Sequence, residues 1–224
     1  MIPRILIDKV ETPGGGKELH LYQHDKDFII TAGNFELMNS RAHASEEELA
    51  KLAMIKITGQ ANPRVLIGGL GMGFTLRAAL NSLPQTAEVV VAEIVPAVVK
   101  WNQGLLAGLA GNPLADKRVK IYEGDAAELI KTGKNGYDAI VLDVDNGPEG
   151  LVLESNDWFY GFKGLNVILG ALRAKGVLGI WSASMDEQLT YRLKNAGFLV
   201  EEIRVRSRPG GKGRHHHLWI SVKK

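Results

Sequence analysis

The chain has 224 residues, 45% of them apolar and 23% charged, a composition typical of a globular protein and unlike that of a disordered or fibrous one. Its 27 lysines and arginines against 25 aspartates and glutamates leave a net charge of +2, so no charge excess points to a nucleic-acid partner. Cysteine is absent, which excludes disulfides, thiolate metal sites and cysteine nucleophiles. No apolar run reaches the roughly 20 residues of a membrane span, and the first residues lack a secretory signal pattern. We therefore expect a cytoplasmic protein without membrane contact.

The first 58 residues predict a small β cap followed by a helix. Short apolar runs separated by turn residues predict antiparallel strands at Ile5-Leu6-Ile7, Leu19-His20-Leu21-Tyr22 and Phe28-Ile29-Ile30-Thr31. The run Ser45-Glu46-Glu47-Glu48 has the pattern of a capping box, which predicts a helix ending near Ile57. The open edges of such a sheet make it a candidate element for homodimer formation.

Residues 59–224 predict a single catalytic-type domain in which strands and helices alternate. The expected strands are Val65-Leu66-Ile67, Val89-Val90-Val91-Ala92, Val119-Lys120-Ile121-Tyr122, Ala139-Ile140-Val141-Leu142 and Val177-Leu178-Gly179-Ile180-Trp181. The expected helices are 73–82, 96–109, 125–131, 161–174 and 185–196. This alternation predicts an α/β fold with a doubly wound, mostly parallel, Rossmann-like sheet. Strand-like segments at 198–206 and 216–222 predict that the sheet ends in an antiparallel hairpin.

Four of the 26 glycines fall in one run, Gly68-Gly69-Leu70-Gly71-Met72-Gly73, between the first buried strand and the following helix. Glycines there allow positive φ angles and let a ligand approach backbone amides at the start of a helix. The spacing is not the dinucleotide fingerprint, because Phe74 stands where that pattern has its third glycine. No Lys-Ser or Lys-Thr pair follows, which excludes a P-loop. The alternative is a tight turn with a purely structural role.

Acidic residues end the next two strands. Glu93 comes about twenty residues after the glycines, where a carboxylate accepts hydrogen bonds from both ribose hydroxyls. Asp125 and Ala126 follow the third strand, where a carboxylate can accept from the exocyclic amine of adenine. The alternative role of Asp125 is to cap the helix that begins at Ala126, and the two roles are compatible.

Two more carboxylates, Asp143 and Asp145, leave the end of the fourth strand, where ligands bind in open α/β sheets. Neighbouring acids raise one another's pKa, which suits a general base acting on an amine. The alternative is a turn, since Asp145 begins the sequence Asp-Asn-Gly-Pro. That alternative does not account for Asp143 at the end of the strand.

These elements, together with Asp157-Trp158-Phe159-Tyr160, resemble the class I S-adenosylmethionine-binding fold and, more closely, the spermidine synthase family of aminopropyltransferases. The resemblance implies a sulfonium nucleoside as co-substrate, S-adenosylmethionine or its decarboxylated form, with no metal, and a polyamine or other amine as acceptor. It places the nucleoside on the loop, the ribose on the acid after strand two, adenine on the Gly-Asp pair and the base on the aspartate after strand four. The candidate cofactor-binding residues are Gly68, Gly69, Gly71, Gly73, Glu93, Asp125 and Ala126, and the candidate catalytic residues are Asp143 and Asp145.

Two departures from the family pattern leave alternatives open. The family's loop carries an aspartate that pairs with the donor's amine, whereas this loop has Leu70. The family's second acid after strand four falls on Asn146, unless Asp145 replaces it by a shift of one residue. An S-adenosylmethionine-dependent methyltransferase is therefore the first alternative, and a nucleoside-binding protein without catalysis is the second.

Three further features carry weaker expectations. Neighbours in His215-His216-His217 point to opposite faces of a strand, so we expect no metal site there. The aromatic run Trp158-Phe159-Tyr160 is expected to wall the acceptor site or to pack a helix. A basic group around the C-terminal loop predicts a solvated hairpin tip, with contact to an anion or RNA as the alternative; it consists of Arg204, Arg206, Arg208, Lys212 and Arg214.

Overall fold

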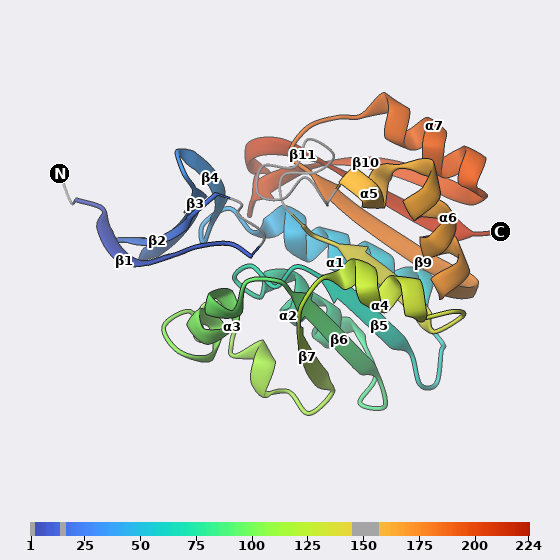
Figure 1. Cartoon of the computed structure of the whole chain (residues 1–224), viewed down its shortest axis with the longest axis horizontal. Coiled ribbons are helices and arrows are strands. Elements are labelled where there is room, and N and C mark those ends of the chain that lie inside the picture. The colour runs from blue at the N-terminus through green and yellow to red at the C-terminus, as the bar shows by residue number, and fades with distance from the viewer. Residues whose placement is uncertain (1–2, 14–16, 145–156) are drawn as a thin grey trace.

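The computed structural model describes residues 3–13, 17–144 and 157–224, which form a small and a large β-sheet with helices around the large one (Figure 1). The small sheet is antiparallel with strand order β1-β2-β3-β4. Its strands are β1 (Ile5–Val10), β2 (Leu19–His24), β3 (Asp27–Ala32) and β4 (Phe35–Asn39). The three predicted strands are confirmed. Strand β4 was not predicted, because its five residues do not alternate between apolar and polar.

Helix α1 (Ala44–Lys56) follows the small sheet and packs on the large one, with Leu49 and Ala53 against Gly179. The predicted capping box is wrong: His43 is the N-cap residue and no side chain caps the helix. Ser45 is instead buried within the first turn, where its hydroxyl contacts distant residues. The domain boundary at residue 58 stays a prediction.

The large sheet has seven strands in the order β10-β11-β9-β8-β5-β6-β7. Strands β9, β8, β5, β6 and β7 run parallel, and β11 pairs antiparallel with both β9 and β10. The predicted doubly wound sheet with a terminal antiparallel hairpin is thus confirmed. The strands are β5 (Arg64–Gly68), β6 (Glu88–Glu93), β7 (Val119–Glu123), β8 (Tyr137–Leu142), β9 (Leu172–Ser182), β10 (Phe198–Arg208) and β11 (Lys212–Lys223).

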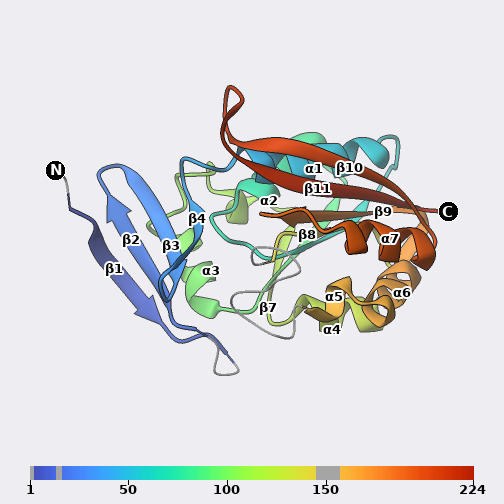
Figure 2. The same ribbon diagram turned by 90° about the horizontal axis from the view of Figure 1, so that it is seen from above.

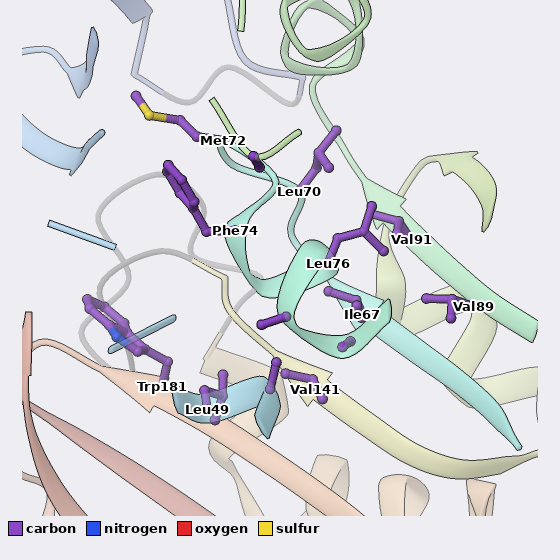
Figure 3. Close-up of a cluster of buried hydrophobic side chains, with 14 of the residues drawn as sticks. Leu49, Ile67, Leu70, Met72, Phe74, Leu76, Val89, Val91, Val141 and Trp181 are labelled. Atoms are coloured by element: carbon purple, nitrogen blue, oxygen red, sulfur yellow. The ribbon is translucent and has the colours of Figure 1, made fainter. Parts of the chain in front are cut away.

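Helices cover both faces of this sheet, and a separate hydrophobic core lies under each layer (Figure 2). Because successive side chains of β5 point to opposite faces of the sheet, Val65 and Ile67 lie in one core and Leu66 lies in the other. The first layer holds α1, α2 (Phe74–Ser82) and α3 (Pro96–Gln103); the second holds α4 (Ala126–Thr132), α5 (Asp157–Tyr160), α6 (Phe162–Ala171) and α7 (Glu187–Ala196). Figure 3 shows Leu70 and Leu76, from the loop and helix after β5, in the first core.

Two predicted helices end earlier than expected. Helix α3 stops at Gln103 rather than near residue 109, because Gly104 follows it outside the helical region. The helix predicted over 161–174 ends at Ala171, where Leu172 already pairs with Tyr137 as the first residue of β9. Long-range pairing therefore overrides the local helical pattern at this point.

Candidate nucleoside and amine site

The glycine loop after β5 adopts a backbone that other residues reach only with strain. Gly69, Gly71 and Gly73 have φ angles of 89°, 52° and 82°. A Cβ atom at Gly69 would overlap the carbonyl oxygen of Asp143, and one at Gly71 would overlap the end of Met38. The loop is also tied to the strand beside it, since the amide of Asp143 donates to the carbonyl of Gly68 at 2.9 Å. Glycine at position 69 thus lets the ends of β5 and β8 approach closely.

A cavity opens at the carboxyl ends of the parallel strands, and we call it the strand-end cavity. Its polar wall consists of Glu46, Gly69, Gly71, Glu93, Asp125 and Asp143, and its apolar wall includes Leu37, Met38, Ile94, Val98, Phe159 and Trp181. Six of the nine predicted site residues line it, namely Gly69, Gly71, Glu93, Asp125, Ala126 and Asp143.

The other three predicted residues have different positions. Gly68 is not a lining residue; it packs within β5 against Leu142 and Ala126. Gly73 is the N-cap residue of α2, and a Cβ atom at this position would lie 3.0 Å from Cγ of Pro113. Asp145 lies outside the described residues.

Glu93, at the end of β6, is a buried carboxylate that holds the loop in place. Its Oε2 accepts a hydrogen bond from the amide of Leu70 at 3.0 Å, and its Oε1 accepts one from the amide of Val95 at 2.9 Å. The two bonds join the glycine loop to the start of α3. Glu93 also lines the strand-end cavity, and contact of its carboxylate with a ribose remains a prediction.

Asp125 combines the two roles considered for it in one position. Its Oδ1 accepts from the amide of Ala127 at 2.8 Å and so caps α4. The residue also lines the strand-end cavity, where Gly124 is bound to the carbonyl of Glu93 at 2.9 Å. Helix capping is therefore observed, and contact with adenine remains a prediction.

Asp143 follows β8 and faces the strand-end cavity. Burial raises the pKa of its carboxyl from 3.8 to about 6, against an opposing hydrogen bond from Thr75. The Thr75 hydroxyl donates to Oδ2 at 2.5 Å. A carboxylate with a pKa near the working pH can accept a proton and release it again, as a general base requires.

Glu46 is a fourth acid of this cavity, and the sequence analysis missed it. Only 7% of the residue is exposed, and burial together with the charges of Asp143 and Glu47 raises its pKa well above 4.5. No hydrogen bond or ion pair joins its carboxyl group to another described side chain. Nothing local distinguishes Glu46 from the two glutamates that follow it, since its burial depends on how α1 packs against β9 and β11.

The first turn of α1 is anchored by a hydrogen-bonded group from three elements. The Ser45 hydroxyl accepts from Nε1 of Trp181 at 3.0 Å and lies 2.8 Å from Nδ1 of His216. Burial, with the nearby Arg214 charge, lowers the pKa of His216 from 6.5 to about 4, so the ring is neutral at pH 7. A neutral ring forms this hydrogen bond as donor or acceptor, depending on which ring nitrogen carries its proton. This group fixes the residue that follows Ser45, which is Glu46.

The structure also bears on the histidine run, the aromatic run and the expectation about membrane spans. His215 lies beside Arg204 and His217 beside Glu202, and among residues 3–13, 17–144 and 157–224 no group of three metal-ligating side chains comes together. Of the aromatic run, Phe159 lines the strand-end cavity, whereas Trp158 lies under Lys131. No helix within the described part of the chain has the length and apolar character to cross a membrane.

The order of the parallel strands, the glycine loop after the first of them and the acids after the next three define the class I methyltransferase-like fold. Comparison with protein families narrows this class: the spermine/spermidine synthase domain matches residues 42–196. The chain belongs to that family. The match begins just before α1 and ends with α7.

Curated relatives and solved structures agree with this membership. A polyamine aminopropyltransferase of Prochlorococcus marinus is 34% identical over 115 residues, which are 51% of this chain and 40% of that protein. A spermine synthase of Arabidopsis thaliana is 30% identical over 161 residues, 70% of this chain and 42% of that protein. The matched segments thus span less than half of these relatives. The Thermotoga maritima spermidine synthase structure has the same fold, with a TM-score of 0.76 at 18% identity, covering 98% of this chain and 73% of that one.

Proposed function

We propose that this protein transfers an aminopropyl group from decarboxylated S-adenosylmethionine to an amine. One observation carries the choice of donor: the described lining of the strand-end cavity contains four acids, Glu46, Glu93, Asp125 and Asp143, and no lysine, arginine or histidine. S-adenosylmethionine would bring a carboxylate into this acidic lining without a cationic partner. The decarboxylated donor carries only positive groups there, an ammonium and a sulfonium.

In this chain Leu70 stands where the family's loop carries the aspartate that pairs with the donor's amine. Leu70 is a core residue, 4% exposed, and its amide rather than its side chain serves the site by donating to Glu93. The counter-charge for the donor's ammonium must therefore come from another lining acid. Glu46 has the required properties, because it is buried, lines the cavity and has no cationic partner among the described residues.

The bound donor supplies a sulfonium, whose carbon–sulfur bond breaks as the acceptor nitrogen bonds to that carbon and methylthioadenosine leaves. Before this step the acceptor nitrogen must lose its proton, because an ammonium has no free electron pair. We assign this proton transfer to Asp143, because Asp143 lines the same cavity and its carboxyl has a pKa of about 6. Thr75 holds the carboxylate in position through its bond to Oδ2. The remaining contribution of the protein is to hold donor and acceptor together.

Calorimetric titration with decarboxylated S-adenosylmethionine, S-adenosylmethionine and methylthioadenosine tests the donor. We expect the decarboxylated donor and methylthioadenosine to bind, and S-adenosylmethionine to bind at least tenfold more weakly. Mass spectrometry of primary amines incubated with the decarboxylated donor should then show addition of an aminopropyl group. Tighter binding of S-adenosylmethionine would favour the methyltransferase alternative. If none of the three binds, the nucleoside assignment is wrong.

A further inference from the structure

A second hollow adjoins the strand-end cavity, and we call it the hairpin groove. It lies between β4 of the small sheet and the loop end of the β10–β11 hairpin, which Figures 1 and 2 both show on the same side of the large sheet. Four residues line both hollows, namely Leu37, Met38, Glu46 and Trp181. The two hollows therefore meet at the buried Glu46.

The two ends of the hairpin groove differ in charge. Its inner end lies at Glu46, whose carboxyl shares the strand-end cavity with Asp143. At its outer end, Arg208 and Arg214 line the groove from the two strands of the hairpin. Both arginines are exposed, and neither forms an ion pair or hydrogen bond with another described side chain. Two cations without a partner among the described residues thus face a hollow whose inner end holds the buried carboxyl group of Glu46.

The remaining polar residues of the groove do not cancel this difference. Glu36 is the only other acid among the described lining residues, and it already lies 3.9 Å from Arg4 and accepts a hydrogen bond from Asn39. His216 is neutral at pH 7 and adds no charge. Ser207 is a buried residue of β10 that lines the groove, and its hydroxyl makes no hydrogen bond with a described residue. The outer end therefore offers cations and a hydroxyl donor, which together suit an anion.

We propose that the hairpin groove binds the acceptor and that the acceptor is an amine with an anionic group at its other end. Its amine lies beside Asp143, where the groove meets the strand-end cavity, and its carboxylate or phosphate lies at Arg208 and Arg214. This assignment rests on the proposed function for the amine end alone. The proposed acceptor therefore differs from a polyamine. The second ammonium of a polyamine would lie next to two arginines rather than next to a carboxylate.

Three four-carbon probes that differ only at the far end separate these possibilities. They are 4-aminobutanoate with a carboxylate, 1-aminobutane with a methyl group and 1,4-diaminobutane with an ammonium. Each is titrated into the full chain by calorimetry, with and without saturating methylthioadenosine. We expect 4-aminobutanoate to bind at least tenfold more tightly than 1,4-diaminobutane, with 1-aminobutane between them.

Variants at the two arginines test the location. In the double variant Arg208→Gln/Arg214→Gln, the ratio between 4-aminobutanoate and 1,4-diaminobutane should fall below threefold. Arg204→Gln is the matched control, because Arg204 is an exposed arginine of the same hairpin that lies beside His215 and does not line the groove. The control should keep the full ratio. The unfolding curve of the double variant should coincide with that of the unmodified chain, since neither groove arginine has a partner among the described side chains.

Two results would overturn the proposal: equal or tighter binding of 1,4-diaminobutane by the unmodified chain, or an unchanged ratio in the double variant. Neither depends on donor binding, because the titrations without methylthioadenosine give the same comparison. Absence of methylthioadenosine binding with a retained preference for 4-aminobutanoate would contradict the proposed function and leave the groove assignment standing. Methylthioadenosine binding with a preference for the diamine would contradict the groove assignment and leave the proposed function standing.

Discussion

The hydroxyl of Thr75, in the first turn of α2, donates a 2.5 Å hydrogen bond to Oδ2 of Asp143 at the end of β8. The bond favours the charged carboxylate and so lowers a pKa that burial raises to about 6. If Asp143 is the base, kcat/KM should fall about tenfold per pH unit below pH 6, because only the carboxylate accepts a proton. Replacing Thr75 by valine removes the bond, and this acid limb should move to higher pH. Thr75→Ser keeps the hydroxyl and should leave the acid limb at the same pH. An acid limb that does not move in Thr75→Val would contradict the assignment of Asp143 as the base.

Replacement of Asp143 by asparagine separates catalysis from donor binding. Asparagine cannot take the acceptor's proton, so kcat should fall by about 10² to 10⁴, the range of general base catalysis. The dissociation constant of methylthioadenosine should change by less than about threefold, since methylthioadenosine is not the acceptor whose ammonium Asp143 deprotonates. Single-turnover assays and calorimetry measure the two effects. Unchanged turnover would exclude Asp143 as the base.

Glu93→Gln should weaken the donor rather than slow the chemistry. The carboxylate accepts from the amides of Leu70 and Val95, and glutamine offers only one acceptor oxygen for the two. Hydrogen bonds to charged groups contribute about 1.5–3 kcal/mol, so loss of one predicted bond from Glu93 to the ribose corresponds to roughly a 10- to 150-fold weaker donor. Glu123→Gln is the control, since Glu123 ends the neighbouring strand β7 without lining the cavity. Equal donor affinities for both variants would show that Glu93 does not serve the ligand.

Two glycine-to-alanine changes should have opposite effects on the free energy of unfolding. At Gly69 the φ of 89° and the carbonyl oxygen of Asp143 both oppose a Cβ atom, so Gly69→Ala should lower stability by more than about 1 kcal/mol. Gly170 lies exposed in α6 with nothing within 4 Å of a Cβ position, so Gly170→Ala should raise stability by about 0.5–1 kcal/mol. Urea denaturation measures both. A Gly69→Ala variant as stable as the unmodified chain would show that the loop does not need its glycine there.

His216 makes the fold sensitive to acid. Its folded pKa of about 4 lies below 6.5, so the unfolded chain binds the extra proton first and stability falls as pH drops from about 6.5 to 4. The loss is at most about 3 kcal/mol at 1.36 kcal/mol per pKa unit. Asp143 acts in the opposite sense, because its raised pKa destabilises the fold as pH rises from 3.8 to about 6. Comparison with His216→Gln isolates the histidine: the variant should lose less stability between pH 6.5 and 4.5, and equal losses would contradict this account.

The sequence alone determined the class of fold and most of the residues that we propose for the donor. Runs such as Val65-Leu66-Ile67 are apolar throughout because strands of a parallel sheet are covered on both faces, so they identify the sheet without any tertiary information. The glycine run and the acids Glu93, Asp125 and Asp143 follow directly from those strands. Since parallel strands end at one edge, their position in the chain already places them together.

Only the tertiary structure brought together the residues that we propose for the acceptor. Glu46 belongs to a run of three glutamates that look alike in sequence, and its burial depends on the packing of α1 against β9 and β11, where Ser45 contacts His216, 171 residues away. Arg208 and Arg214 likewise appear in sequence as two members of a basic run, and the hairpin register selects them for the groove. Contacts between distant segments depend on packing and strand register, which local patterns do not encode. Helix capping shows the same dependence on distant contacts. Ser45 has the local pattern of an N-cap, but its hydroxyl forms hydrogen bonds with the distant His216 and Trp181 instead.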